Sequence, residues 1–367
     1  MRNIDDIVNS GFCLDDLGAG DEYRGLAFLS LRIALKAYFS TYRCAANMIM
    51  EYNELKMCRN MVYQEACTEA IIHFQHFIEL IVKDILTQKH PLLVIDAARK
   101  PMIYYKLLKG EKLEESETSQ LNTVEFSESL KRINELADNN IFEAPINDLI
   151  KKYTTVMSKI NTLRNRLLHR GRFVLHYEAI DNLYGRFILP LILKITSIPL
   201  YANREREWKY RRLECDIDPI NEIIDECGKD SIDAKKIAFL KELARAAYEN
   251  PLHDLKQDMD EADTQCYSEE NDEIEKKYKI HSDAELSILN KDTNGKITIN
   301  KCPVCGLRLI ISNYGQGKTW LISLGGEKIT IFMVDAFCKC CSFEIHSNLD
   351  NPKKYGYPIE DFWNFKD

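Results

Sequence analysis

The segment of this sequence best equipped for chemistry spans residues 160–171. Its apolar residues recur at helical spacing, which predicts one face of an amphipathic helix that ends at the final glycine. The polar face carries Arg164, Asn165 and His169. From residue 151 to residue 177 there are seven Lys or Arg and no Asp or Glu. Fixed positive charges beside a titratable imidazole suit a phosphodiester, because the charges hold the phosphate while the imidazole transfers protons.

The same residues carry a family resemblance. Arg164-Asn165-x-x-x-His169 resembles the Arg-x(4–6)-His signature, with Asn after the Arg, of HEPN-domain ribonucleases. The resemblance covers about residues 20–200. It implies a metal-independent endoribonuclease of toxin or anti-phage defence type, with His169 as general base or acid, Arg164 as transition-state stabiliser and Asn165 as an orienting hydrogen-bonder. Glu79, in a Glu-x-x-x-Lys pattern on an earlier helix, is similar to a polar residue of the family's second helix and is a fourth candidate.

RNA is the partner that these features predict, and four nearby basic residues are the expected contacts: Lys159, Arg166, Arg170 and Arg172. Residues five apart differ by about 140° around a helix, so Arg164 and His169 do not share a face. The family resolves this with a homodimer in which motifs from two protomers meet, and we expect the same composite site here. The resemblance also implies that an antitoxin or sensor partner gates the activity.

Two other interpretations remain open at this point. Arg164 and His169 could simply favour a helix C-terminus, where the helix dipole stabilises cations. The whole chain could instead be a non-catalytic adaptor, in which a helical dimerisation bundle carries a module that docks a protein or nucleic acid. Cleavage of RNA by the wild type but not by His169→Ala would separate the enzyme from the adaptor.

A second group of residues that could carry out chemistry lies near the C-terminus. Two knuckles, Cys302-Pro-Val-Cys305 and Cys338-Lys-Cys-Cys341, enclose short strand-like runs at residues 307–312, 318–324 and 327–334. Four thiolates at this spacing bind one zinc tetrahedrally, so the segment resembles a zinc ribbon. Closed four-cysteine sites are structural, and we expect a structural Zn²⁺ and no catalytic metal. Cys340 could replace a neighbour as ligand.

Composition and charge limit the remaining possibilities. The net charge of −8 hides an asymmetry, because residues 1–212 hold 30 Lys or Arg against 27 Asp or Glu and the remainder holds 19 against 30. Any nucleic-acid surface is therefore expected in the N-terminal part. The chain shows no signal peptide and no apolar run that would span a bilayer, and most cysteines outside the knuckles are scattered. These features predict a cytoplasmic protein in a reducing compartment, with no membrane contact.

The predicted fold is mainly α: an antiparallel, HEPN-like helical bundle, a helical linker and a small β zinc ribbon. The expected domains are the bundle at 1–205, with an inserted loop at about 100–145, a helical and acidic linker region at 206–295, the ribbon at 296–350 and a tail at 351–367. Apolar periodicity and proline positions predict helices over about residues 21–55, 60–88, 145–170, 177–198, 219–226 and 234–250.

Two further stretches allow competing interpretations. Residues 204–212 mix aromatic and basic side chains, which fits either bases stacking on Trp208 or Tyr210, or a solvated helix face held by salt bridges. Gly315-Gln-Gly-Lys-Thr319 resembles part of a phosphate loop but lacks the required earlier glycine, because that position is Ser312. A hairpin turn is the expected structure there.

Overall fold

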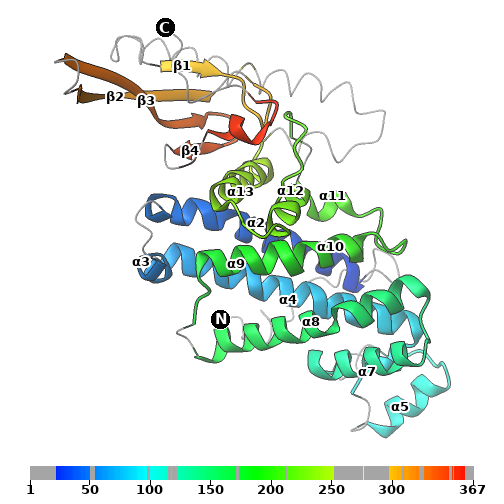
Figure 1. Ribbon diagram of the computed structural model, residues 1–367. Coiled ribbons are helices and arrows are strands. Elements are labelled where there is room, and N and C mark those ends of the chain that lie inside the picture. The colour runs from blue at the N-terminus through cyan, green and yellow to red at the C-terminus, as the bar shows by residue number, and fades with distance from the viewer. Residues whose placement is uncertain are drawn as a thin grey trace, which may run out of the picture. The chain divides into compact units, whose positions relative to one another are not determined.

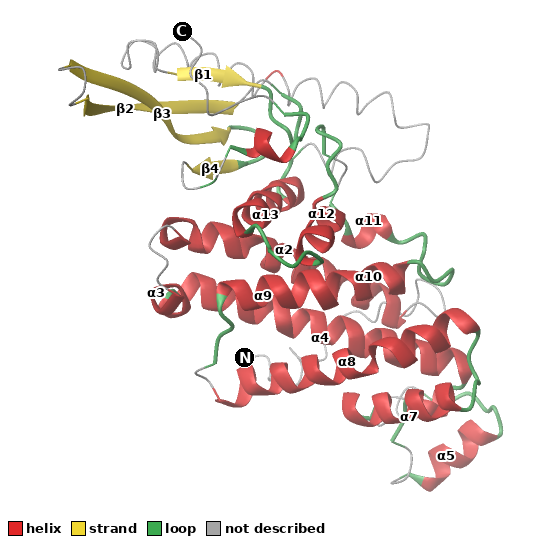
Figure 2. Ribbon diagram, in the orientation of Figure 1, coloured by secondary structure: helices red, strands yellow, loops and turns green. Residues whose placement is uncertain are grey.

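The computed structural model shows a mainly helical chain with a small antiparallel sheet near the C-terminus (Figures 1 and 2). The structure describes residues 22–49, 54–96, 100–114, 117, 122–170, 173–210, 213–251, 276, 297–307, 310–321, 326–346, 349 and 351–359. The chain forms two compact units, one made of residues 1–34 and 71–171 and the other of residues 35–70 and 172–367. This division differs from the predicted bundle at 1–205, because residues 35–70 and 172–205 belong with the C-terminal part.

In its described residues, the first unit contains parts of two long helices, the helices α5, α7 and α8 whose bounds follow, and a 3-10 helix at Pro91–Leu93. Helix α2 (Glu22–Ile49) contributes its first turns and α4 (Met61–Lys89) its C-terminal part. The apolar stripe predicted on α4 is buried and consists of Phe74, Phe77, Ile78, Ile81 and Ile85. Phe28 of α2 packs against Phe77, with ring centroids 6.0 Å apart. The α4 helix ends before Pro91 as predicted, because a residue preceding proline is pushed out of helical geometry.

The segment expected as an inserted loop at about 100–145 is helical over much of its length. It contains α5 (Pro101–Leu108) and α7 (Phe126–Asp138). The α7 helix buries Leu130 and Ile133, and it forms a hairpin with α8 (Ala144–Arg170) through a short connection that includes Asn140 in left-handed conformation. Polar residues are frequent in this segment, but those of α7 lie on one face, so a helix forms.

The second unit begins with the rest of α2, the short helix α3 (Glu54–Arg59) and the start of α4. The predicted helix at 177–198 is present as α9 (Tyr177–Leu183), a π-helical turn (Tyr184–Ile188) and α10 (Leu189–Thr196). The Leu189 amide donates to the Tyr184 carbonyl, five residues back. Pro190 follows directly, and because its nitrogen has no hydrogen, the wider turn accommodates it without a sharp break.

The helices predicted at 219–226 and 234–250 are confirmed as α12 (Pro219–Cys227) and α13 (Ala234–Tyr248), and the short helix α11 (Glu205–Trp208) lies at the start of the predicted linker region. Every residue of α13 from Ile237 to Tyr248 is buried, so this helix is a core element. Trp208 is fully buried and Tyr210 is 5% exposed. Neither ring offers a face for a base, and neither lies on a solvated helix surface.

Over the described residues, the sheet has four strands in the order β1 (Ile297–Asn300), β2 (Ile310–Leu321), β3 (Gly326–Cys338) and β4 (Glu344–His346), all antiparallel. The predicted hairpin turn at Gly315–Thr319 is wrong, because these residues pair with Phe332 to Lys328 inside the long β2–β3 ladder. A residue inside a paired strand also differs from a phosphate loop, because that loop lies at a strand-to-helix turn. The ladder continues to the pairing of Leu321 with Gly326.

Two predictions fall outside the described residues: the helix end at Gly171, and the part of the acidic linker region at 252–275 and 277–295. The tail does begin with structure, since a 3-10 helix spans Pro352–Tyr355 and the Tyr357 hydroxyl donates to Glu222 at 2.8 Å. None of the described helices is long and apolar enough to cross a bilayer.

Candidate functional site

Four cysteines come together in the second unit. Cys302 and Cys305 lie in the turn between β1 and β2, Cys338 ends β3, and Cys341 lies in the turn before β4. All four are buried, and their Sγ atoms lie within 4.8 Å of one another. Among the residues that the structure describes, this is the group of His, Cys, Asp or Glu side chains that could hold a metal ion such as zinc.

Each knuckle is a tight turn closed by backbone hydrogen bonds. In the first, the Cys302 amide donates to the Leu307 carbonyl at 2.8 Å, and in the second, the Cys338 amide donates to the Phe343 carbonyl at 2.7 Å. The residue after the last cysteine is left-handed in both, with φ of 78° at Gly306 and 59° at Ser342. The two turns therefore repeat one backbone design, although serine adopts this conformation less readily than glycine.

The sulfur spacing fits a tetrahedral metal ion. The Sγ atoms of Cys302 and Cys341 are 3.5 Å apart, and those of Cys305 and Cys338 are 3.7 Å apart. Four thiolates about 2.3 Å from a central ion are separated by about 3.8 Å, close to both distances. Burial raises the pKa of the Cys302 and Cys341 thiols, whereas hydrogen bonds from the surrounding thiols lower the pKa of Cys305. A bound cation would hold all four as thiolates.

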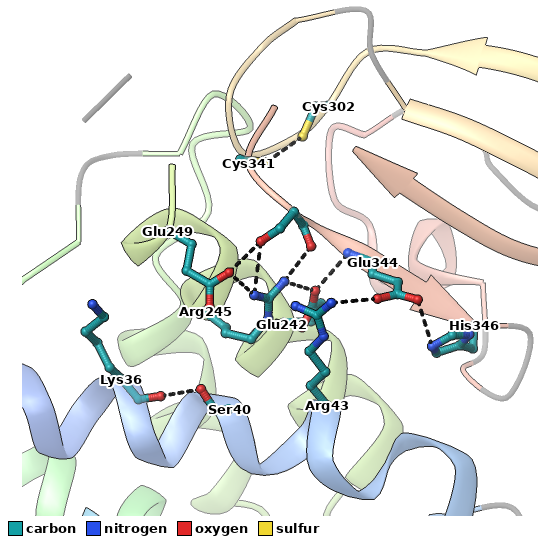
Figure 3. Close-up of polar contacts among 11 residues, drawn as sticks. Lys36, Ser40, Arg43, Glu242, Arg245, Glu249, Cys302, Cys341, Glu344 and His346 are labelled. Atoms are coloured by element: carbon teal, nitrogen blue, oxygen red, sulfur yellow. Dashed lines mark hydrogen bonds and ion pairs between the residues drawn. The ribbon is translucent and has the colours of Figure 1, made fainter. Parts of the chain in front are cut away.

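A polar cluster connects the second knuckle to α13 (Figure 3). The Arg245 guanidinium donates Nε to Glu242 Oε2 at 2.7 Å and Nη2 to Glu242 Oε1 at 2.6 Å, and Nη2 also reaches the Ser342 carbonyl at 2.6 Å. The Ser342 hydroxyl donates to Glu249 at 2.6 Å. The Glu344 amide donates to Glu242 at 2.8 Å. The knuckle beside Cys341 is thus held by charge-assisted bonds from one helix.

The predicted catalytic helix is α8, in the first unit. Arg164 is half-buried, and its Nη1 donates to Asn165 Oδ1 at 3.1 Å. Its Nε is buried without a hydrogen-bond partner among the described residues. His169, Lys159 and Arg166 are exposed. Arg170 is the last residue of α8, its side chain lies outside the described part, and Arg172 lies outside it altogether.

The structure brings Arg164 toward the polar face of α4. There Glu79 accepts from Lys83 Nζ at 2.7 Å and from Gln75 Nε2 at 3.1 Å. His76 lies beside this pair, and Arg164 is close enough to act on it electrostatically. Within the described residues, no hydrogen bond joins His169 to Arg164 or to Glu79. The four predicted catalytic residues therefore split into a group around α4 and an exposed histidine at the end of α8.

Sequence reasoning missed two features of these sites. His76 shares a helix face with Glu79 and Lys83, at i, i+3 and i+7, but this spacing alone predicts no role for it, and no local pattern predicts its contact with Ser30. Sequence reasoning also placed Glu242 and Arg245 on a linker helix. Their spacing of three residues is an ordinary helical ion-pair signal, but only burial distinguishes it from a surface pair.

Comparison of the chain with protein-family models, with curated proteins and with solved structures finds no match.

Proposed function

We propose that the protein is a metal-independent endoribonuclease of toxin or anti-phage defence type. The observation that supports this most is the state of Arg164: a half-buried guanidinium whose Nη1 is oriented by Asn165 and whose buried Nε has no acceptor among the described residues. The Nη groups of this half-buried guanidinium suit a phosphate oxygen, whereas the buried Nε is not reached from solvent. The surroundings on α8 are basic, since no acid occurs between residues 151 and 177.

The proposed reaction is transesterification within the RNA. The 2′-hydroxyl loses its proton to a base and attacks the adjacent phosphorus, and the P–O5′ bond breaks as the 5′ oxygen takes a proton from an acid. The products are a 2′,3′-cyclic phosphate and a free 5′-hydroxyl. Arg164 stabilises the charge on the five-coordinate phosphorus, and His169 transfers one of the protons. Lys159, Arg166, Arg170 and Arg172 contribute positive charge for binding RNA.

We propose that two copies of the chain build the complete site. Arg164 and His169 are separated by about 140° around α8, so one phosphate reaches both side chains most readily when a second protomer supplies one of them. An antitoxin or sensor protein would gate this activity, and the cytoplasm is the proposed compartment. Light scattering of the full chain at tens of micromolar should give twice the monomer mass, and a fully active monomer would contradict the composite site.

We propose zinc as the ion of the four-cysteine site, with a structural role. Closed sites with four thiolates leave no position for a substrate or a reactive water. Elemental analysis of freshly purified protein should give about one zinc per chain. Finding another metal at that stoichiometry would contradict the identity of the ion but not the ligand set.

RNA digestion in EDTA, followed by mass analysis of the 3′ ends, tests the ribonuclease. Loss of a well-placed transition-state donor costs a factor of about 10²–10³, and loss of an acid–base group a factor of about 10²–10⁴. Arg164→Ala and His169→Ala should therefore each nearly abolish cleavage. His90→Asn is the matched control, because His90 is exposed and Asn also accepts the hydrogen bond by which it caps the next turn.

Two outcomes would contradict the chemistry. Activity that EDTA removes and magnesium restores, or products with a plain 3′-hydroxyl, would indicate hydrolysis by metal-bound water. Restoration of the activity by zinc alone would instead indicate that the activity depends on the ion of the four-cysteine site. Wild-type protein that forms a dimer and binds a partner without cleaving RNA would support the adaptor interpretation.

A further inference from the structure

The first unit holds a second histidine in a fixed orientation. The Oγ of Ser30, on α2, lies 2.8 Å from Nδ1 of His76, on α4. Ser30 is 2% exposed, so water does not compete well for this contact. A serine hydroxyl rotates between donor and acceptor, and it can hold the ring in both protonation states of the imidazole.

The other ring nitrogen of His76 is available for chemistry. Nε2 makes no hydrogen bond to the described residues, and this atom is not fully buried. When Nδ1–H donates to Ser30, Nε2 carries the lone pair. A ring fixed on one side with a lone pair on the other is the arrangement of a general base.

The charges around His76 come from two helices. Burial lowers its pKa below the usual 6.5, the positive charges of His73, Lys83 and Arg164 act in the same direction, and Glu79 acts against them. A lowered pKa means that more than half of the imidazole is neutral at pH 6.5 and that the neutral fraction is larger at pH 7. Glu79 is a poorer base, because its carboxylate already accepts from Lys83 and Gln75.

We propose that His76 is a further catalytic residue of this site, acting as the general base, and that Ser30 is its positioning residue. This inference rests on the proposed ribonuclease function. Nε2 of His76 takes the proton of the 2′-hydroxyl, and the O2′–P bond forms with the released electron pair. The P–O5′ bond breaks, and the 5′ oxygen takes a proton from the protonated His169. Arg164 holds the phosphate between them.

The test compares pH–rate profiles of four full-length proteins. The wild-type rate should fall on acidification with an apparent pKa below 6.5. His76→Gln should lower the rate by about 10²–10⁴ and remove that acidic limb. Ser30→Ala should lower it by about fivefold, the value of one ordinary hydrogen bond, and shift the limb. His90→Asn should match the wild type. Unchanged melting temperatures of the variants would exclude misfolding as the cause.

Nitrogen NMR of the His76 ring provides a readout independent of cleavage. We expect the neutral ring to carry its proton on Nδ1 and to titrate below pH 6.5, and Arg164→Gln should raise its pKa. A proton on Nε2, or wild-type activity and pH profile in His76→Gln, would overturn the role of His76 while leaving the ribonuclease intact. Wild-type protein that cleaves no RNA would instead overturn the proposed function, and the role of His76 with it.

Discussion

At the scale of single residues, two adjacent cysteines have different surroundings. Cys341 brings its Sγ into the group with Cys302, Cys305 and Cys338, whereas Cys340 is buried but lies outside that group. Strand β3 ends at Cys338, and the chain then closes the second knuckle. In this turn the third residue after Cys338, which is Cys341, faces the first knuckle, and Cys340 does not. Cys340 still affects the centre, since its thiol contributes to lowering the pKa of Cys305.

Cys341→Ser should therefore lose the metal, while Cys340→Ser keeps about one equivalent per chain. The loss should also destabilise the second unit strongly, because the free energy of binding a structural ion is folding free energy, on the order of 10 kcal/mol for zinc. Elemental analysis of the two purified variants, together with thermal unfolding, measures both effects. The opposite pattern of metal content would show that Cys340 is the ligand.

A buried ion pair is the second feature at this scale. Lys241 Nζ lies 2.7 Å from Asp181 Oδ1, and it also lies over the Tyr177 ring, 4.1 Å from the centroid. Burial lowers the pKa of Lys241 and raises the pKa of Asp181, in each case against the attraction of the partner. Desolvation is thus the larger effect on both groups, and the pair persists because neither member can reach water.

Lys241→Met should lower the free energy of unfolding by about 3–5 kcal/mol, because it leaves the Asp181 carboxyl buried without its partner. The double variant Lys241→Met, Asp181→Leu should recover most of that loss, since an apolar pair of similar volume avoids the desolvation cost. Urea unfolding of the two variants and the wild type provides the comparison. A double variant that is less stable than Lys241→Met would contradict the conclusion that desolvation is the larger effect on this pair.

At the scale of elements, α13 is a charged helix placed in a core. One side of it meets β4 and the second knuckle, and Lys241 on the same helix reaches α9 and α2. Figure 1 shows α13 between the sheet and these helices of the second unit. Glu242 and Arg245 tolerate burial because they bind each other in two parallel hydrogen bonds.

Arg245→Lys should cost about 2–3 kcal/mol of stability, because an ammonium group cannot donate in parallel to Glu242 and also reach the Ser342 carbonyl. The contact lies next to Cys341, so metal affinity should fall by about 10–100-fold as well. Chemical unfolding and competition with a chelator measure the two effects. Arg206→Lys, at an exposed position on α11, is the control and should stay within about 0.5 kcal/mol of the wild type. Equal behaviour of the two variants would contradict the role assigned to Arg245.

At the scale of the whole molecule, the two units interleave along the chain. The second unit takes residues 35–70 from between the two parts of the first and continues from residue 172 to the C-terminus. Within it, the π-helical turn and α10 contact α12, where Gly185 lies against Cys227 and Ile223. The boundary predicted at residue 205 therefore cuts through one unit.

A fragment of residues 1–205 should lose cooperative unfolding and bind a dye specific for exposed apolar surface. It would uncover the buried isoleucines of α9 and α10, and burial of each contributes about 1.5–3 kcal/mol. Circular dichroism during heating, compared with the full chain, gives the result. A fragment that melts as sharply and at the same temperature as the full chain would restore the predicted boundary.

Local sequence patterns predict the features that depend on neighbours along the chain. Apolar periodicity located α4, α8, α12 and α13 within two residues at each end and α2 at its start, and the spacing of cysteines identified the four that come together. Both are local patterns, because a helix repeats every 3.6 residues and a knuckle closes within four.

Contacts between residues far apart in sequence follow from the folded structure alone. Ser30 and His76 are 46 residues apart, and Glu242 and Glu344 are 102 residues apart, so no local pattern predicts either contact. The same holds for Trp208, whose neighbours in sequence are charged but whose ring is fully buried. The burial of α13 likewise reversed its predicted role, because a charged helix can enter a core only when distant residues satisfy its charges.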